Sequence, residues 1–310
     1  MEKEHYLQKP MTVMALALLC CFLWGSAFPC VKIGYDLFAI AADDTMSQML
    51  FAGCRFALSG LLVILFGSIL VKRVLVPEKK SVGMVLKLAM VQTVMQYVLF
   101  YIGLAHTTGV KSSIINASNV FISLILASLL FRFEKLAVRK IVGCLIGFAG
   151  VVIINLNGNG IDASFSLKGE GAIFLSTVAY ALSSGLIKLY SQKENPVVLS
   201  GYQFLIGGLV MIVIALFLGG RITSGGAAAF FLLLYMALIS AVAYTLWGIL
   251  LKYNPVAKVA VFGFMTPVFG VLLSALLLGE RNQAFGWRGI AALLLVCVGI
   301  YVVNKGKQQK

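Results

Sequence analysis

The sequence predicts an all-α polytopic membrane protein, with ten transmembrane helices arranged as two inverted five-helix repeats. Three observations lead to this fold class. The chain of 310 residues is 61% hydrophobic and only 12% charged. Apolar stretches long enough to cross a bilayer follow one another along almost its whole length. The pattern of the first half then returns in the second half.

The composition excludes a soluble domain. The mean hydropathy is +0.99, and a soluble chain of this size would lack the polar residues needed to cover its outside. A spanning helix takes roughly 20 residues, so the chain has room for about ten. Its 6 cysteines lie within apolar runs without paired spacing, which is typical of packing residues. We therefore expect no disulfide framework, no metal site and no cofactor.

Each predicted span is an apolar run that ends at a turn or charge signal. Acidic pairs, basic clusters, or Gly, Pro and Asn residues mark the connecting loops, and the shortest connection lies at Asn254-Pro255. The predicted spans are residues 12–35, 47–71, 83–104, 111–131, 139–156, 169–190, 197–219, 227–251, 256–279 and 286–304.

The basic residues predict the orientation of the chain. Most of the 25 Lys and Arg residues fall in loops that ten helices would place on the same side as both termini. Positive charge accumulates on the cytoplasmic side of membrane proteins. Residues 1–11 and 305–310 are therefore predicted to be short cytoplasmic tails of a protein in the cell's inner or plasma membrane. The orientation of the chain then explains the net charge of +14 without a nucleic-acid partner. The expected partner is the lipid bilayer.

A repeated unit organises the two halves. Residues Trp24–Lys32 begin with an aromatic ring, continue with small residues and end in a lysine, and Tyr180–Lys188 do the same. An odd number of helices in each half forces the second half upside down relative to the first. The predicted repeats are residues 12–156 and 169–304. Further matches between them are Arg55-Phe56 with Gln203-Phe204, Tyr97 with Tyr244, Asn119 with Pro267, and Glu134 with Glu280.

These features together resemble the EamA family of the drug/metabolite transporter superfamily. The features are Trp24-Gly25-Ser26 with Lys32, Arg55-Phe56, and Pro267-Val268-Phe269 before Gly279-Glu280-Arg281. The resemblance covers residues from about 12 to 304. It implies ten helices with cytoplasmic termini, and transport, often export, of amino acids or related metabolites. The two halves differ at one matched position, because the first half has Asn119 where the second half has Pro267.

Polar and aromatic residues within the predicted spans are the candidates for contact with a small-molecule solute. A transporter needs such groups to face a cavity inside the membrane rather than lipid. Amides, hydroxyls and rings suit a polar, zwitterionic or aromatic solute. We expect two proline bends, at Pro29 and Pro267. The predicted solute-binding residues are Trp24, Gln96, Asn116, Asn119, Tyr180, Ser183, Tyr244 and Trp247.

Several of these residues have a structural explanation as well. Ser183 can bond to its own helix backbone, and the amides of Gln96 and Asn116 can bond between helices. Tyr101, near a helix end, is expected in the aromatic belt at the membrane surface. Arg55 within a span can hold a solute carboxylate or clamp backbone carbonyls. Because the second half has Gln203 at that position, we favour the clamp.

Other functions fit the sequence less well. A multidrug or nucleotide-sugar carrier is the nearest alternative within transport. A lipid-modifying membrane enzyme would need a nucleophile, an acid–base pair or a metal cluster, and the sequence has only 2 His residues and no convergent carboxylates. The small-residue step at Gly143 and Gly147 favours packing within the bundle over a homodimer, which the sequence leaves open.

Overall fold

The structure is a computed structural model of the chain, and it describes residues 7–132, 138–154, 156–157, 160–161, 166–223, 225–254, 259 and 261–304. The predicted tails therefore lie largely outside the described residues, as does Glu134. The first half contains α2 (Pro10–Leu37), α3 (Thr45–Val71), η1 (Lys79–Ser81), α4 (Val82–Leu88), η2 (Ala89–Met95), α5 (Gln96–His106), α6 (Gly109–Asn116), α7 (Asn119–Leu129) and α8 (Val138–Ile154). The rest contains β1 (Leu156–Asn157), β2 (Gly160–Ile161), η3 (Leu167–Gly171), α9 (Ala172–Tyr190), α10 (Pro196–Phe217), α11 (Gly226–Tyr253), η4 (Val261–Phe264), α13 (Met265–Leu277), α14 (Arg281–Phe285) and α15 (Trp287–Asn304).

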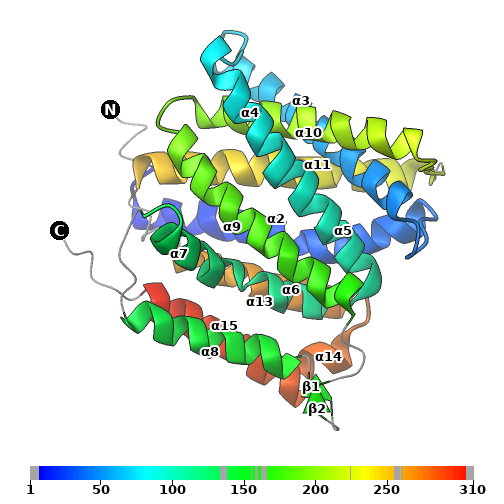
Figure 1. Ribbon diagram of the computed structural model, residues 1–310, viewed down its shortest axis with the longest axis vertical. Coiled ribbons are helices and arrows are strands. Elements are labelled where there is room, and N and C mark those ends of the chain that lie inside the picture. The colour runs from blue at the N-terminus through cyan, green and yellow to red at the C-terminus, as the bar shows by residue number, and fades with distance from the viewer. Residues whose placement is uncertain are drawn as a thin grey trace.

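The helices lie roughly parallel to one another, with α3 and α10 at one edge of the bundle and α8 and α15 at the other (Figure 1). Within the part of the chain that the structure describes, 7 helical segments are long and apolar enough to cross a membrane, and 3 shorter apolar helices accompany them. The all-α membrane class is confirmed, and the small antiparallel ladder of β1 and β2 does not change it. A count of ten crossings remains the prediction.

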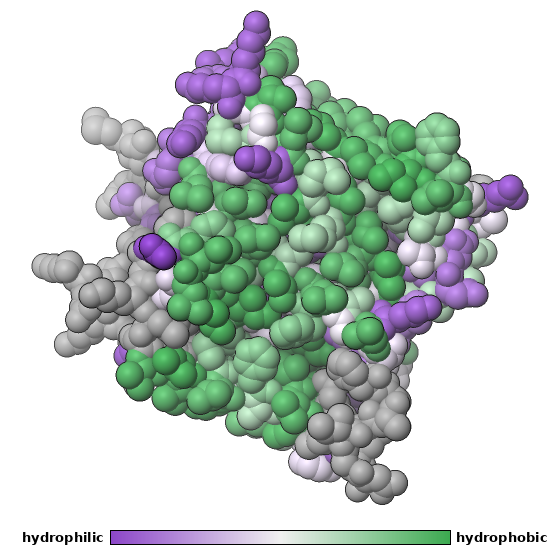
Figure 2. All heavy atoms as spheres, in the orientation of Figure 1, coloured by the Kyte–Doolittle hydropathy of each residue, from purple (hydrophilic) through white to green (hydrophobic). Residues whose placement is uncertain are grey.

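The surface agrees with this class. Figure 2 shows apolar side chains over the middle of the bundle and hydrophilic ones toward its two ends. Largely exposed apolar residues such as Leu70, Phe217 and Leu145 lie on the outer helices. Such exposure would be costly in water and is ordinary in lipid.

The two halves pack with inverted twofold symmetry. Among the described elements, α2 packs on α11 and α13, while its counterpart α9 packs on α5 and α7. Likewise α3 packs on α11 as α10 packs on η2. The matching helices α3 and α10 pair with each other in opposite directions, because Gly53 lies beside Gly208 and Gly60 beside Gly201. Opposed directions of matching helices are what an inverted repeat requires.

Small residues permit the closest of these contacts. A Cβ on Gly60 would lie 2.3 Å from the backbone nitrogen of Leu205, and one on Gly208 would lie 2.3 Å from that of Ala57. At the other edge, a Cβ on Gly299 would lie 2.6 Å from the carbonyl oxygen of Gly143. The Gly143 step thus packs α8 against α15 within the bundle.

Several spans are irregular where the sequence predicts plain helices. The third span contains the π-helical segment η2, and the fourth is broken at residues 117–118, between α6 and α7. In the second half, the 3₁₀ segment η4 directly precedes α13, a few residues before the position that matches the break. Both halves are therefore irregular in this span, in different ways. Pro29 lies within the continuous helix α2, and Pro267 is in the first turn of α13, where proline is tolerated.

Candidate functional site

Four rings from both halves meet near the middle of the bundle, and we call Trp24, Tyr97, Tyr244 and Trp247 the aromatic centre. The ring of Trp24 on α2 lies 5.6 Å from that of Tyr244 and 5.1 Å from that of Trp247, both edge to face. The hydroxyl groups of Tyr97 and Tyr244 are 3.0 Å apart. Helices α2 and α5 of the first half thus meet α11 of the second half through aromatic side chains.

The aromatic centre contains an unused hydrogen-bond donor. The Nε1 atom of Trp24 is buried and has no partner among the described residues. A buried donor without an acceptor costs about 1–3 kcal/mol. A bound molecule that presents a carboxylate or carbonyl oxygen to Trp24 would recover that energy.

Arg55 is fully enclosed beside this centre, with 2% of its surface exposed. Its Nε donates to the carbonyl oxygen of Met236 at 3.1 Å, and its Nη2 donates to the hydroxyl of Ser240 at 3.2 Å. Its Nη1 donates to the hydroxyl of Tyr101 at 3.1 Å. These three bonds join α3 to α11 and α5, as a structural clamp would. All three partners are neutral, and no carboxylate pairs with Arg55 among the described residues.

Tyr101 corrects the sequence interpretation. It is 0% exposed and holds Arg55, and its backbone oxygen accepts from the hydroxyl of Tyr35 at 2.6 Å. The expectation of a membrane-surface belt position was wrong, because the sequence does not show that Arg55 needs this hydroxyl.

Three more predicted residues are placed against the same centre or beside it. Gln96 is 7% exposed and its side chain lies within interaction range of Tyr97. Tyr180 lies close enough to Tyr97 and Tyr244 for their phenol groups to interact electrostatically. Ser183 donates to the carbonyl oxygen of Tyr180 at 2.8 Å, so its hydroxyl is satisfied by its own helix.

The two asparagines lie at the break in the fourth span. Asn116 is the last residue of α6 and Asn119 the first of α7, and both are partly buried. Helix α6 packs on α13, where Ser113 donates to the carbonyl oxygen of Pro267 at 3.2 Å. Asn116 and Asn119 therefore belong to the broken helix rather than to the stacked rings, and their contact with solute remains a prediction.

The structure adds polar groups to the predicted solute-binding set. Tyr97 was identified from the sequence as the counterpart of Tyr244, but not as a solute-binding residue. Ser26 on α2 and Tyr235 on α11 share a hydrogen bond of 2.8 Å. Gln92 and Gln203 are 0% exposed, and neither amide has a partner among the described residues. The signal for Gln92 was present, since it stands one turn before Gln96.

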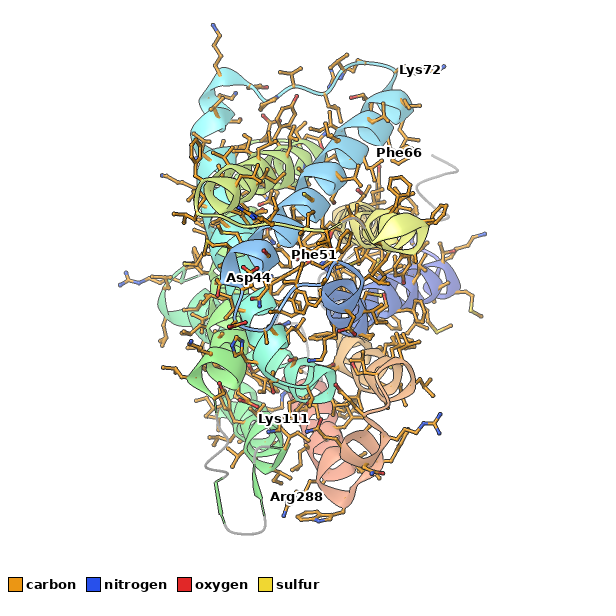
Figure 3. The ribbon with its side chains drawn as sticks, turned by 90° about the vertical axis from the view of Figure 1, so that its right-hand side faces the viewer. Asp44, Phe51, Phe66, Lys72, Lys111 and Arg288 are labelled. Carbon is orange, nitrogen blue, oxygen red and sulfur yellow. The ribbon has the colours of Figure 1, made fainter. Side chains whose placement is uncertain are left out.

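A second group of polar residues links the two halves at the end of the bundle where Figure 3 labels Lys111. We call Lys32, Thr107, Lys111, Glu170 and Glu280 the end cluster. Lys32 ends the repeated unit of the first half, and its Nζ donates to the carbonyl oxygens of Leu104 and Thr107, at 2.9 and 2.7 Å. The first helix therefore holds the connection between α5 and α6.

The two glutamates hold the same connection from the second half. Glu170 is 3% exposed, accepts from the Thr107 hydroxyl at 2.6 Å and pairs with Lys111 at 3.3 Å. Glu280 accepts from the backbone N–H groups of Gly109 and Val110, at 3.0 and 2.8 Å. These are the first N–H groups of α6, which have no partner within the helix. The carboxylate also faces the positive end of the helix dipole.

The fold and the site define a polytopic membrane protein whose inverted halves enclose a buried aromatic and polar centre, with one end closed by charged groups. Among the described residues, no three His, Cys, Asp or Glu side chains gather as metal ligands. The EamA-like transporter family model matches residues 11–156 and 167–305. The chain belongs to this family, so the resemblance read from the sequence is confirmed.

Similar proteins support the same class. A cyanobacterial protein from Synechocystis, named an uncharacterized transporter, is 27% identical over 93% of this chain and 88% of its own length. A protein of Escherichia coli named "Probable amino-acid metabolite efflux pump" is 26% identical over 93% of each chain. A solved crystal structure superposes with a TM-score of 0.63 at 14% identity, over 94% of this chain and 96% of its own, which shows a shared fold. These names point to transporters rather than enzymes.

Proposed function

We propose that this protein is a secondary transporter that exports amino acids or related small metabolites across the inner or plasma membrane. Its termini lie in the cytoplasm, and its two halves move by alternating access about the aromatic centre. The observation that carries the proposal is the unused Nε1 donor of Trp24, buried where α2 of the first half meets α11 of the second. Family membership and the name of the Escherichia coli relative support the substrate class.

An amino acid offers groups that match this centre. Its carboxylate would accept from Trp24 Nε1 and face the positive charge of Arg55. Its ammonium group would be attracted to the faces of the surrounding rings. The hydroxyl pair of Tyr97 and Tyr244 would supply further hydrogen bonds. Residues Gln96, Tyr180 and Trp247 would form the rest of the wall.

The end cluster supports a direction of access in this conformation. It ties α2, the connection between α5 and α6, and the second-half residues Glu170 and Glu280 together. Solute would then reach the centre from the side of the termini. Release on the opposite side would require these bonds to part, as alternating access of inverted halves demands.

Transport into proteoliposomes tests the proposal. A panel of labelled amino acids, with and without a proton gradient, should identify at least one transported solute. Trp24→Phe keeps a ring and removes the N–H donor, so we expect KM for that solute to rise about tenfold. Phe231→Leu, at an exposed position near the start of α11, is the control. Transport by Trp24→Phe that equals the wild type would contradict the role of this donor, and a panel without any transported member would contradict the substrate class.

A multidrug carrier is the alternative that the aromatic centre favours, because flat apolar molecules pack well between aromatic side chains. A lipophilic dye transported in the same vesicles, with no competition from amino acids, would support it. A nucleotide sugar fits less well, since Arg55 is the single cation described beside the centre.

A further inference from the structure

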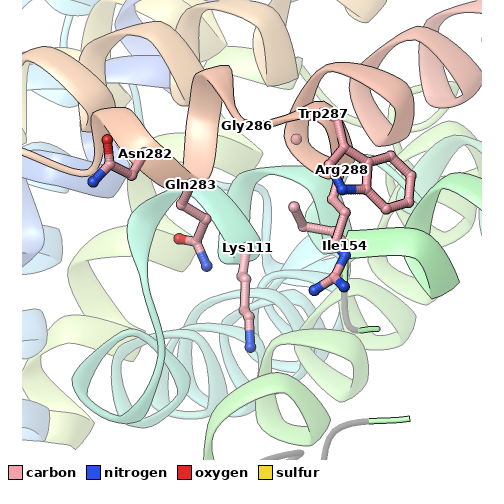
Figure 4. A pocket seen from close by; sticks show the side chains of 8 residues that line it. Lys111, Ile154, Asn282, Gln283, Gly286, Trp287 and Arg288 are labelled. Carbon is pink, nitrogen blue, oxygen red and sulfur yellow. The ribbon is translucent and has the colours of Figure 1, made fainter. Parts of the chain in front are cut away.

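A pocket of about 280 Å³ lies outside the aromatic centre, between the first turns of α6 and α15 (Figure 4). Two of the residues that line it, Lys111 and Arg288, carry positive charge, and none carries negative charge. Their charged ends extend in the same direction (Figure 4). The remaining lining residues are Ile154, Asn282, Gln283, Gly286, Trp287 and Gly289.

The backbone adds to the attraction for an anion. Trp287 is the first residue of α15, which runs for 18 residues. The leading N–H groups of a helix lack partners within it and carry the positive end of the helix dipole. Gly286, Trp287, Arg288 and Gly289 all line the pocket, so this positive end faces it.

Lys111 is held in position by an ion pair with Glu170. Its Nζ lies 3.3 Å from Glu170 Oε1, and Glu170 is anchored by Thr107 and by the backbone N–H of Ser166. Gln283 is likewise held by a hydrogen bond with the hydroxyl of Thr108. The pocket wall is therefore organised before any ligand arrives, which lowers the entropy cost of binding.

The rim of the pocket is apolar and faces outward. Trp287 is 70% exposed, and beside it Phe285 and Ile290 are 53% and 46% exposed. Farther along α15, Leu294 and Val298 continue the exposed apolar side. A water-soluble anion would gain nothing from this surface. An amphiphile with an anionic head and hydrocarbon chains would use both parts.

We propose that this pocket binds the headgroup of an anionic phospholipid, with the phosphate between Lys111 and Arg288 and the acyl chains along the exposed side of α15. The guanidinium group of Arg288 suits a phosphate, which it can bind through two parallel hydrogen bonds. Trp287 occupies the interface position that its amphipathic ring prefers. This site is separate from the transported solute, so it does not depend on the identity of that solute.

The 3 tryptophans of the chain allow a direct test. Protein labelled with 5-fluorotryptophan gives one ¹⁹F NMR signal for each, and Trp287→Phe assigns the signal at the pocket. Purified protein in a neutral detergent is titrated with phosphatidylglycerol, with phosphatidylcholine of the same chains, and with soluble glycerol phosphate. We expect phosphatidylglycerol alone to shift the Trp287 signal, while the signals of Trp24 and Trp247 stay in place.

Matched variants locate the contact. Arg288→Gln should weaken the phosphatidylglycerol response about tenfold, because it removes a charged hydrogen-bonding partner. Arg281→Gln, an exposed residue of α14 outside the lining, should respond like the wild type. An equal response to phosphatidylcholine, or equal weakening by Arg281→Gln, would overturn the proposal. A full shift with glycerol phosphate would assign the pocket to free phosphate instead of lipid. The wild-type titrations decide between these results even if Arg288→Gln does not fold.

Discussion

Arg55 and Gln203 occupy matching places in the two halves, and their surroundings differ. Arg55 on α3 faces Met236 and Ser240 of α11. Gln203 on α10 lies one turn from Gly207. A Cβ added at Gly207 would lie 2.5 Å from Thr93 of η2 and 3.1 Å from the carbonyl oxygen of Ala89. In the alignment of the halves that pairs Tyr97 with Tyr244, Ala89 matches Met236 and Thr93 matches Ser240.

The matching helices therefore pack alike in both halves, but one interface contains a cation that makes three hydrogen bonds and the other an amide that makes none among the described residues. The helix beside Gln203 is also π-helical over Ala89–Met95, whereas α11 is regular. Inverted halves of equal chemistry would give two conformations of equal energy when they exchange shapes. If the halves exchange shapes as the proposed transport requires, the unequal pair would bias that balance. Segments of π-helix are often found at functional sites.

Replacing Arg55 by glutamine makes the first half like the second and should have the largest effect. The change removes bonds to Met236, Tyr101 and Ser240, and leaves the last two with unpaired hydroxyls. We expect a loss of about 3 kcal/mol in the free energy of unfolding. Thermal unfolding of the purified protein in detergent measures it, with Arg221→Gln on an exposed loop as the control. An unchanged midpoint would mean that the clamp contributes nothing.

At the α3–α10 contact, by comparison, substitutions of matching glycines in the two halves should lower the free energy of unfolding equally. Gly60→Ala and Gly208→Ala both force a Cβ onto backbone atoms of the facing helix, so each should cost about 2 kcal/mol. Gly83→Ala on α4 is the matched control, because its Cβ would meet nothing within 4 Å. The same unfolding assay compares all three. Clearly different losses at Gly60 and Gly208 would show that the symmetry of this contact is only apparent.

Glu280→Ala tests the closed end of the bundle. The substitution removes two hydrogen bonds at the first turn of α6 and should cost about 1–2 kcal/mol. Hydrogen exchange of peptides that cover residues 104–116 should become faster, since Gly109 and Val110 lose their acceptor. The corresponding change at Glu134 would show whether the opposite end is held alike. Unaltered exchange after Glu280→Ala would contradict the capping role.

Gln203→Leu should have the smallest effect and the opposite sign. The side chain is buried with an unpaired amide, so an apolar replacement of similar size should raise the free energy of unfolding by about 1 kcal/mol. Its matched partner is Gln48→Leu, where two bonds to carbonyl oxygens would be lost and stability should fall. Destabilisation by Gln203→Leu would indicate that this amide is satisfied by a group such as bound water or solute.

Several features of the site can be predicted from the sequence. Trp24, Tyr180 and Tyr244 stand out because the repeat places rings at matching positions, and the structure brings them to one region. Arg55 stands out because a charge within an apolar span needs partners. The partners themselves, Met236, Ser240 and Tyr101, were not predictable, since they lie far away in the chain and nothing local distinguishes them.

The irregular helices were also hidden from the sequence. The segment Ala89–Met95 has the composition of an ordinary helix, and its π-helical form accompanies close packing on α10 at Gly207. The break at residues 117–118 contains no proline or glycine from which it could be predicted. Local propensities in membrane helices are easily overruled, because neighbouring helices can satisfy the freed backbone groups.

The sequence by itself determined that this chain belongs in a lipid bilayer, because its apolar stretches are too long and too numerous for a soluble domain. It also predicted that the second half repeats the first in the opposite orientation. Tertiary structure alone decided which polar groups found partners. Arg55 is satisfied and Gln203 is not, since hydrogen bonds across the bundle depend on how distant helices meet, and no local pattern encodes that geometry.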